Sequence, residues 1–488
     1  MNQNQGKIAK YKVPEGLIIS PSGMRGIWQK NLPPYVVLRF CEAFGTWLKE
    51  NTKKDNPLVL IGMDTRTTGP ILKHAVISGL LAVGCNVIDT DVCPTPVLMF
   101  GHKYYQCDGT VIISASHNPP EYNGIKCLAP SGTFLSREEL EEINKWFIYG
   151  DPVYTTWDKY GILRKENPWY QYVALMMRFI DLEVIKARNH DKKLVVVFDP
   201  GAGAGTHKTD EILHTLECNV ISINEDLINN KFPRSFEPIK EHLTDLEKKM
   251  AEVNADVGFA HDCDADRIAL IDEKGNCLPE DTILAIIVNY MLEQMHKNYQ
   301  KITLVTNCAS SLTLEKLGAK YNATVIRTPV GERYLASKMM ELLREQPNDH
   351  LVFGGEGSCG GVMLPIFNNA RDGMFAAIKV IEILSKTRKT VSQLVDELPK
   401  FYTRRIKITL ESSSAEAIMQ NLKKFLSERN KTYQEIDQDV RISDDEKNEW
   451  VLVHPSNTEP IIRIISEAPT DERAIELCNE MNQMIQRL

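Results

Sequence analysis

Short apolar runs rich in β-branched residues alternate with longer amphipathic stretches along most of this chain. In the first third, residues 57–63, 86–92 and 109–116 have the composition of buried strands. Residues 71–84 lie between two of them, have helical periodicity and end at a glycine. This alternation is typical of α/β domains with mostly parallel sheets. We therefore expect an α/β fold.

The same order of elements recurs twice more along the chain. In each set an apolar strand, a turn containing Gly or Ser, a helix and a second apolar strand follow one another. The pattern predicts three copies of one α/β unit with mostly parallel, mixed sheets. The strands expected in the second and third sets are residues 193–199, 217–226, 256–262, 302–307, 323–329 and 350–356.

From Lys400 onward the pattern changes. Residues 401–410, 450–456 and 461–468 read as strands around a helix that begins near Ser414, and another helix closes the chain. These elements predict a smaller α+β domain with an antiparallel sheet. Polar or Pro/Gly-containing connections give the expected domain ranges 1–168, 169–275, 276–399 and 400–488.

Composition and charge exclude several classes of function. The chain has 488 residues, 43% hydrophobic residues and a net charge of −8. This charge disfavours nonspecific binding to nucleic acid or to anionic membranes, although a local basic cluster can still bind an anionic substrate. The eleven cysteines form no CxxC pair, and the N-terminal residues are polar. We expect a cytoplasmic protein with reduced thiols and no nucleic-acid or membrane partner.

Unusual residues gather where predicted strands end, which is where α/β sheets bind ligands. The first group is 114–126, where prolines, Asn and Gly predict an irregular loop. Within it, Ser116 is followed by His117, and Lys126 lies ten residues on. A nucleophilic serine needs such charged neighbours. The alternative is a polar turn without chemistry.

The second group is 261–267, with aspartates at positions 262, 264 and 266. Three carboxylates this close repel one another unless a cation neutralises them, and they leave coordination room for a phosphate oxygen on Mg²⁺. A helix–loop–helix calcium site is excluded, because it requires glycine where Arg267 stands and because a strand follows. A solvated acidic turn is the remaining alternative.

Two further groups suggest sugar and phosphate binding. In 354–361, closely spaced glycines would let a ligand approach the backbone, and Glu356 and Ser358 offer an acceptor and a donor. In 454–463, polar side chains and amides predict an anion nest with Arg463. The alternatives are a tight β-turn and a hairpin turn. The glycine-rich 199–206 lacks dinucleotide-binding spacing and is interpreted as a close-packing turn.

In this order, and with Ser-Gly-Met-Arg-Gly at 22–26, these groups resemble the α-D-phosphohexomutase family over nearly the whole chain. The resemblance implies four domains around a central cleft. It also implies an intramolecular phosphotransferase that interconverts hexose 1- and 6-phosphates through a phosphoserine and a hexose 1,6-bisphosphate. It further implies one Mg²⁺ per chain and a hexose phosphate as substrate.

Carried over by motif, the resemblance assigns a role to each matching residue. Ser116 would carry the phosphate and, with the three aspartates, bind the metal. Lys126 and Arg25 would do acid–base or charge-stabilising work, and His117 and Arg267 would flank the phosphoserine. The implied substrate-binding residues are Glu356, Ser358, Arg333, Ser456, Asn457, Thr458 and Arg463.

Three positions depart from the family pattern. Cys263 stands where glycine is usual, His454 where arginine is common, and Gly360 where phosphomannomutase/phosphoglucomutase enzymes often have histidine. The last departure favours the archaeal-type phosphoglucosamine mutase branch over phosphomannomutase/phosphoglucomutase. A metal-dependent sugar phosphatase and a non-catalytic sugar-phosphate binding protein remain as alternatives, and the chain is expected to be a monomer or a homodimer.

Overall fold

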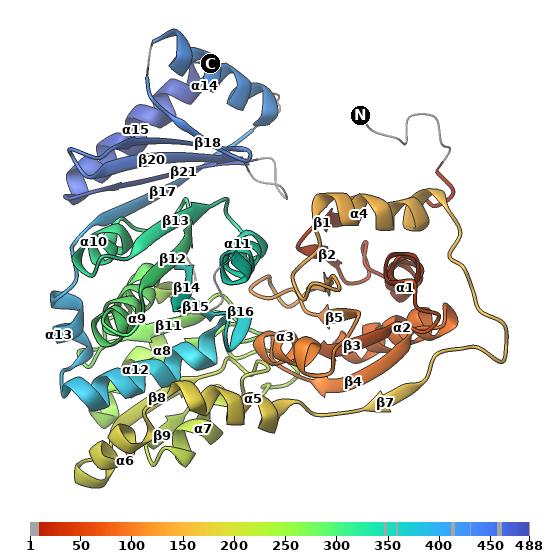
Figure 1. Cartoon of the computed structure of the whole chain (residues 1–488), viewed down its shortest axis with the longest axis horizontal. Coiled ribbons are helices and arrows are strands. Elements are labelled where there is room, and N and C mark those ends of the chain that lie inside the picture. Colours follow the sequence, from red (N-terminus) through yellow and green to blue (C-terminus); the bar gives the residue numbers. More distant parts are fainter. Residues whose placement is uncertain are drawn as a thin grey trace. The chain divides into compact units, whose positions relative to one another are not determined.

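The structure of the protein is a computed structural model that describes residues 9–345, 349–357, 360–410, 415–429, 431–455 and 461–487. It contains two compact units. Unit 1 comprises Met1–Leu278 and Met363–Ser392, and unit 2 comprises Pro279–Val362 and Gln393–Leu488. Each unit is described by itself, with the element labels of Figure 1.

The first sheet of unit 1 has seven strands in the order β1-β2-β6-β5-β3-β4-β7. Strand β3 is parallel to β4 and β5, whereas β6 is antiparallel to β5 and to β2, so the sheet is mixed. The elements of this part are β1 Ile18–Ser20, β2 Gly23–Ile27, α1 Pro34–Thr52, β3 Leu58–Met63, α2 Gly69–Ala82, β4 Asn86–Val92, α3 Thr95–Tyr104, β5 Gly109–Ile113, β6 Tyr122–Leu128, α4 Arg137–Asn144 and β7 Leu163–Lys165.

The second sheet of unit 1 has the order β11-β10-β8-β9. Strands β8, β9 and β10 are parallel, and β11 is antiparallel to β10. The elements here are α5 Trp169–Met176, α6 Leu182–Asp191, β8 Val195–Asp199, α7 Thr209–Thr215, β9 Asn219–Ser222, α8 Thr244–Val253, β10 Val257–His261 and β11 Ile268–Ile271.

Unit 2 begins with a sheet in which the order runs β13-β12-β14 and continues to β15. Strand β12 is parallel to both β13 and β14. The elements are α9 Glu280–Met295, β12 Lys301–Asn307, α10 Thr313–Lys320, β13 Thr324–Thr328, α11 Glu332–Glu345, β14 His350–Glu356 and β15 Gly361–Leu364.

The predicted threefold repeat is confirmed by strand order. In each sheet the third strand of the set pairs with the first, and the first pairs with the second, as in β5-β3-β4, β10-β8-β9 and β14-β12-β13. The first strand also ends alike in every copy. The side chains of Asp64, Asp199 and Asn307 each accept a hydrogen bond from the backbone N–H two residues on. The first strand of each repeat therefore leads into the same local turn.

One predicted loop is wrong. Residues 122–128 form strand β6, although Pro, Asn and Gly in 114–126 favoured an irregular segment over its whole length. Gly124 permits the strand, because a Cβ atom there would lie 2.3 Å from the carbonyl oxygen of Met24 on the neighbouring β2. The glycine thus allows close backbone pairing. The irregular part is confined to the segment between β5 and β6.

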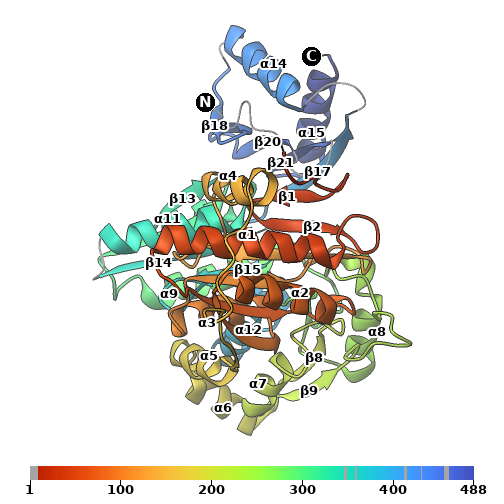
Figure 2. The ribbon, with the colours of Figure 1, turned by 90° about the vertical axis from the view of Figure 1, so that its right-hand side faces the viewer.

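The C-terminal part of unit 2 is the expected α+β domain. Its sheet has the order β17-β21-β20-β19-β18, and all its pairs are antiparallel. Helices α14 and α15 lie on one face of the sheet (Figures 1 and 2), and they share a core that contains Leu422, Ile485 and Ile464. The elements are β17 Tyr402–Thr409, α14 Ala415–Glu428, β18 Gln434–Ile436, β19 Asp439–Asp444, β20 Glu449–Pro455, β21 Ile461–Ala468 and α15 Asp471–Gln486.

Strand β16 (Asn368–Asp372) and helix α12 (Gly373–Thr387) belong to unit 1, although they follow the third repeat in sequence. The side-chain amide of Asn368 donates to the carbonyl oxygen of Pro96 in α3. Helix α12 packs against α6. Among the described residues, no helix combines the length and the apolar character that crossing a bilayer requires.

Candidate active site

The loop that carries Ser116 is held in place by one buried arginine. Arg66 pairs with Asp64 at 3.2 Å, and its guanidinium donates to the carbonyl oxygens of Ser116 (2.7 Å) and Asn118 (2.6 Å). The backbone N–H of Ser116 donates to Ser114 Oγ, and Ser116 has a φ of +50°. A non-glycine residue rarely takes this left-handed conformation, so its presence indicates that the surrounding contacts impose it.

Ser116 contacts the aspartate loop of the second repeat. Its Oγ donates a hydrogen bond of 2.8 Å to Asp262 Oδ2, across 146 positions of sequence. Both residues are buried. The loops that follow β5 and β10, which are equivalent strands of two repeats, therefore bring the predicted nucleophile and the predicted metal ligands together.

The three aspartates lie between β10 and β11 and are all buried. One carboxylate oxygen from each of Asp262, Asp264 and Asp266 lies within 4.8 Å of the others. Lys126 Nζ and Thr95 Oγ1 each lie 2.6 Å from Asp264 Oδ2. Thus two donors from separate elements, β6 and α3, hold the central carboxylate of the cluster.

Burial and mutual repulsion both raise the pKa of these carboxyl groups, whereas the neighbouring donors lower it. Burial, followed by the charges of Asp264 and Asp266, raises the pKa of Asp262 well above its usual range. For Asp264, burial alone would raise the pKa, but Lys126 and Thr95 lower it below the ordinary value. Burial opposes the charge of Lys126, yet Asp264 and Asp266 raise the pKa of its ammonium. Lys126 is therefore protonated at neutral pH.

The residues of this cluster fit a divalent cation. Within the described part of the chain, Asp264 Oδ1 and Asp266 Oδ1 are buried and have no hydrogen-bond partner. An unsatisfied buried carboxylate oxygen is costly, and a hard cation such as Mg²⁺ takes oxygen ligands of this kind. The donor set and the two unpaired oxygens agree with the predicted metal site.

Three other predicted residues surround the same cluster. Arg25, on β2, donates to the side chain of Asn118 at 3.3 Å. Arg267 Nε lies 3.9 Å from Asp262 Oδ2. Burial, followed by the charges of Arg267, Arg25 and Lys126, lowers the pKa of His117 to about 2, so its imidazole is neutral. Its buried Nδ1 has no hydrogen-bond partner among the described residues.

The glycine-rich segment 199–206 supports the aspartate loop. The backbone N–H of Ala204 donates to the carbonyl oxygen of Cys263 at 2.7 Å. A Cβ atom at Gly203 would lie 2.8 Å from that oxygen. The interpretation as a close-packing turn is confirmed. Cys263, one of the departures from the family pattern, is fully buried, and its Sγ lies 3.8 Å from Thr65 Oγ1.

The predicted sugar-binding residues lie in unit 2. Glu356 ends β14 and accepts a hydrogen bond of 2.9 Å from Asn307 Nδ2. Gly354 allows the backbone of β12 to approach closely, because a Cβ atom there would lie 2.0 Å from the carbonyl oxygen of Val305. That glycine therefore serves strand pairing, whereas the sequence favoured approach of a ligand. Arg333 lies in the first turn of α11, and within the described residues its buried Nε has no partner.

Of the predicted phosphate-binding residues, the structure describes Arg463 in unit 2. Arg463 on β21 is paired with His454 on β20. His454 Nδ1 lies 2.6 Å from Asp439 Oδ1.

Gly360 has a φ of +68°, which favours glycine over the histidine that phosphomannomutase/phosphoglucomutase enzymes often have. Four predicted residues lie outside the described residues: Ser358, Ser456, Asn457 and Thr458.

Three residues of the site escaped prediction. Arg66 holds the serine loop, Thr95 holds Asp264, and Arg371 Nη2 lies 2.7 Å from Asp266 Oδ2. None of the three belongs to one of the four motifs that the sequence indicated. The signal available for Thr95 was its place at the first position of a helix after Pro94, where a side chain faces a neighbouring loop. Neither the buried Arg66 nor the half-buried Arg371 had a local signal.

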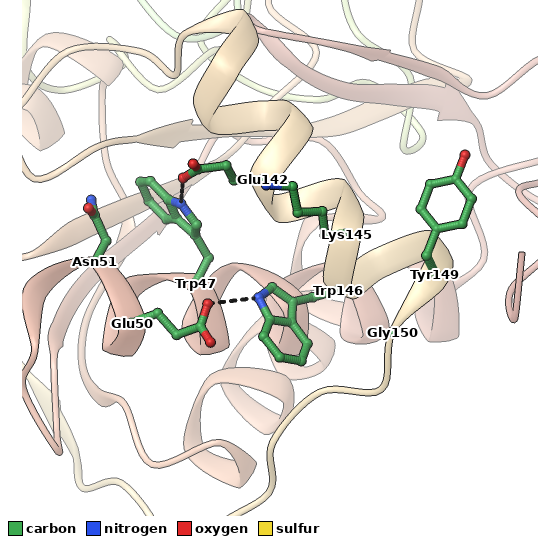
Figure 3. A pocket seen from close by; sticks show the side chains of 8 residues that line it. All are labelled: Trp47, Glu50, Asn51, Glu142, Lys145, Trp146, Tyr149 and Gly150. Carbon is green, nitrogen blue, oxygen red and sulfur yellow. Dashed lines mark hydrogen bonds between the residues drawn. The ribbon is translucent and has the colours of Figure 1, made fainter. Parts of the chain in front are cut away.

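A separate pocket of about 410 Å³ lies elsewhere in unit 1, along α1 and the π-helical segment Lys145–Tyr149 that follows α4 (Figure 3). Two tryptophan–glutamate hydrogen bonds lie there: the indole of Trp47 donates to Glu142, and the indole of Trp146 donates to Glu50. The pocket is lined by none of the predicted site residues. It is distinct from the buried cluster.

Comparison with known families agrees with the order of the motifs. Four models described as phosphoglucomutase/phosphomannomutase match in sequence: alpha/beta/alpha domain I at residues 17–150, domain II at 171–275, domain III at 279–402 and the C-terminal domain at 408–484. These matches define an α/β enzyme of the sugar-phosphate mutase class. The chain belongs to the phosphoglucomutase/phosphomannomutase family of α-D-phosphohexomutases, which are intramolecular phosphotransferases.

Similar proteins cover nearly the whole chain. A phosphoglucomutase/phosphomannomutase of Thermococcus kodakarensis is 36% identical, covering 94% of this chain and 96% of that protein. A "probable phosphoglucosamine mutase" of Pyrococcus abyssi is 35% identical, covering 96% and 98%.

Solved structures share the fold. A phosphoglucomutase/phosphomannomutase family protein from Burkholderia thailandensis has a TM-score of 0.76 at 22% identity, covering 96% of this chain and 98% of that one. The N-acetylphosphoglucosamine mutase of Aspergillus fumigatus, in complex with GlcNAc-6P and magnesium, has a TM-score of 0.59 at 14% identity, covering 96% of each chain. At these identities the likeness concerns the fold alone.

Proposed function

We propose that the chain interconverts hexose 1-phosphate and hexose 6-phosphate through a phosphorylated Ser116 and a hexose 1,6-bisphosphate, and that its preferred substrate is a glucosamine phosphate. The observation that carries the proposal is the 2.8 Å hydrogen bond from Ser116 Oγ to Asp262 inside a buried carboxylate triad. A serine with this environment is suited to phosphoryl transfer, which depends mostly on alignment and on neutralisation of charge.

In the proposed cycle, the P–O bond to Ser116 breaks while a new P–O bond forms to the free hydroxyl of the sugar. The hydroxyl proton passes, in the net reaction, to the oxygen of Ser116. The bisphosphate then presents its other phosphate, which returns to Ser116 by the reverse of these steps. Lys126, protonated and 2.6 Å from Asp264, is the candidate that donates this proton.

The other residues of the cluster have supporting roles in this proposal. Arg25 and Arg267 neutralise charge on the phosphoryl group, and His117, with a neutral imidazole, offers a hydrogen bond beside the phosphoserine. Asp262, Asp264, Asp266 and Ser116 would hold one Mg²⁺. When bound, this ion supplies charge neutralisation and orientation for the transferred group.

Unit 2 supplies the proposed substrate-binding residues. Glu356 accepts hydrogen bonds from sugar hydroxyls, and Arg333 and Arg463 provide positive charge for the substrate. Ser358, Ser456, Asn457 and Thr458 complete the set on the strength of the family motif. The four domains would then be 1–168, 169–275, 276–399 and 400–488.

The preference for glucosamine phosphate has two supports. Several of the relatives that span the chain carry the name "probable phosphoglucosamine mutase", at 33% to 35% identity. Gly360 also stands where phosphomannomutase/phosphoglucomutase enzymes often have histidine. The relative named phosphoglucomutase/phosphomannomutase, at 36% identity, favours the second candidate, which acts on glucose and mannose phosphates.

A turnover assay with four substrates tests the proposal. The 1-phosphates of glucosamine, glucose, mannose and N-acetylglucosamine are each incubated with the enzyme, Mg²⁺ and the matching bisphosphate, and 6-phosphate and free phosphate are both measured. We expect the highest kcat/KM for glucosamine 1-phosphate and little free phosphate. Release of phosphate as fast as isomer formation would favour a phosphatase. Tight binding without turnover would indicate a binding protein.

A further inference from the structure

The two carboxylates with unpaired oxygens share one asymmetry. Asp264 Oδ2 is occupied by Lys126 and Thr95, and Asp266 Oδ2 by Arg371. In both residues the opposite oxygen, Oδ1, is the buried atom without a partner in the described part of the chain. Each carboxylate therefore has one oxygen that is already hydrogen-bonded and one that is available to a ligand.

Arg371 is held rigidly at this place by the residues that follow it. Asp372 accepts hydrogen bonds from the hydroxyl of Tyr172 at 2.8 Å and from the backbone N–H of Phe375 at 2.9 Å, which caps α12. A Cβ atom at Gly373 would lie 2.7 Å from the carbonyl oxygen of Arg267, so the turn packs directly against the aspartate loop. The backbone that carries Arg371 thus has little freedom to move.

We propose that Arg371 is a positioning residue that makes the aspartate triad select Mg²⁺ over Ca²⁺, because it restricts Asp266 to a single ligand oxygen. The inference rests on the metal site of the proposed function. It concerns a residue that touches the ligand Asp266 through a bond of 2.7 Å, with its side chain 12% exposed.

Coordination chemistry links this contact to selectivity. Mg²⁺ is small and demands octahedral geometry with short bonds, for which ligands that offer one oxygen each are sufficient. Ca²⁺ takes six to eight oxygens at longer distances, and carboxylates often bind it with both oxygens. A carboxylate oxygen that is hydrogen-bonded to a guanidinium is oriented toward that donor and binds a cation less readily as a second ligand atom. The arrangement at Asp266, and the parallel one at Asp264, therefore disfavour the larger ion.

The ratio of the two affinities separates this role from simple electrostatics. Removal of the positive charge of Arg371 changes the attraction for both dications in the same direction, since they carry equal charge. The two ions differ in the number of carboxylate oxygens that they take as ligands. The test is isothermal titration of the full-length protein with Mg²⁺ alone and with Ca²⁺ alone, for the wild type, R371M, and R371Q, which keeps a neutral donor.

In R371M, we expect the ratio of Kd for Ca²⁺ to Kd for Mg²⁺ to fall about tenfold, in line with the effect of outer-shell partners on metal sites. R371Q should show a smaller fall, and it tests the inference if R371M does not fold. The matched control is R388M, because Arg388 in unit 1 pairs with Asp191 at 3.2 Å on the surface. Its ratio should equal that of the wild type.

The two proposals fail in different ways. A wild-type ratio retained by a folded R371M or R371Q, as judged by circular dichroism and melting temperature, would overturn the role of Arg371 and leave the metal site intact. If the wild type binds neither ion, the metal site of the proposed function is wrong and this inference is wrong with it.

Discussion

The predicted site residues of unit 1 and those of unit 2 have different partners. In unit 1 the buried charges of the cluster are matched within the unit: Lys126 with Asp264, Arg371 with Asp266 and Arg66 with Asp64. In unit 2 Glu356 is hydrogen-bonded to a neutral amide, and the Nε of Arg333 has no partner among the described residues. The predicted cluster of unit 1 is thus held by ion pairs, whereas in unit 2 the Nε of Arg333 is a buried donor without a partner among the described residues.

This difference suggests separate roles, in which the unit 1 cluster serves phosphoryl transfer and the unit 2 residues serve substrate binding. Preorganised, buried ion pairs resist rearrangement and suit the stabilisation of charge during phosphoryl transfer. A buried donor without an internal partner, such as Arg333 Nε, gains more from a bound ligand. Substitutions in the unit 1 cluster should therefore lower kcat, whereas substitutions of the unit 2 residues should raise KM.

Replacement of Ser116 by alanine should abolish turnover. Because the proposed cycle passes through a covalent phosphoserine, kcat should fall by a factor on the order of 10⁴ or more, while the fold persists. A coupled assay of hexose 6-phosphate formation measures it. The matched control is S131A, at a serine that contacts Thr133 in the same unit, with unchanged kcat. Substantial activity in S116A would show that another group carries the phosphate.

Replacement of Lys126 by methionine should affect catalysis and stability together. Loss of the proton donor should lower kcat by about 10² to 10⁴, and the unpaired buried Asp264 should cost about 3 kcal/mol of stability. Scanning calorimetry and kcat measure the two effects. In the double variant K126M/D264N most of the stability should return without activity.

The control for this pair is K54M. Lys54 pairs with Asp108 at 2.7 Å, but its side chain is 56% exposed, so its loss should change stability by less than about 1 kcal/mol. A double variant of Lys126 and Asp264 that regains activity as well as stability would contradict a catalytic role for Lys126.

Replacement of Arg333 by glutamine should act on binding. Loss of a charge-assisted hydrogen bond to the substrate is expected to raise KM by about 10- to 100-fold, with kcat within a few fold of the wild-type value. Steady-state kinetics with hexose 1-phosphate measures both. R344Q is the matched control, since Arg344 is an exposed residue on the same helix α11. A fall in kcat at constant KM would refute the division between the units.

Replacement of Asp372 should affect stability without affecting turnover, and its effect depends on pH. Burial raises its pKa from 3.8 to about 6, against the hydrogen bonds from Phe375, Tyr172 and Asn368. The folded state therefore binds this proton more tightly, and the stabilisation present below pH 4 is lost as the pH rises through 6. From pH 4 to 7, D372N should gain up to about 3 kcal/mol relative to the wild type. Melting curves of both proteins across this range provide the measurement, and a constant difference would contradict the prediction.

The sequence indicated the candidate residues of the cluster better than the residues that hold them in place. Ser116 and the aspartates of 262–266 stood out as candidates because motifs at strand ends are local in sequence, and the strands 86–92, 350–356 and 461–468 agree with β4, β14 and β21. The threefold repeat was visible because each copy has the same order of apolar runs. Such features depend on neighbouring residues.

Features that depend on distant partners were missed. Thr95 and Asp264 are 169 positions apart, and Arg371 and Asp266 are 105 apart. Strand β6 was missed because the close approach of β2 is what makes Gly124 favourable there. The inclusion of β16 and α12 in unit 1 likewise depends on packing against α3 and α6. Single-sequence patterns contain no information on these pairings.

The central claim is that Ser116 accepts and returns the phosphoryl group. The most direct test incubates the wild type and S116A with hexose 1,6-bisphosphate and a divalent cation, and follows intact mass and the mass of peptides. We predict that the wild type gains one phosphoryl group on Ser116, that added hexose monophosphate removes it, and that S116A gains none. Phosphate on a different residue, or equal labelling of S116A, would contradict the account.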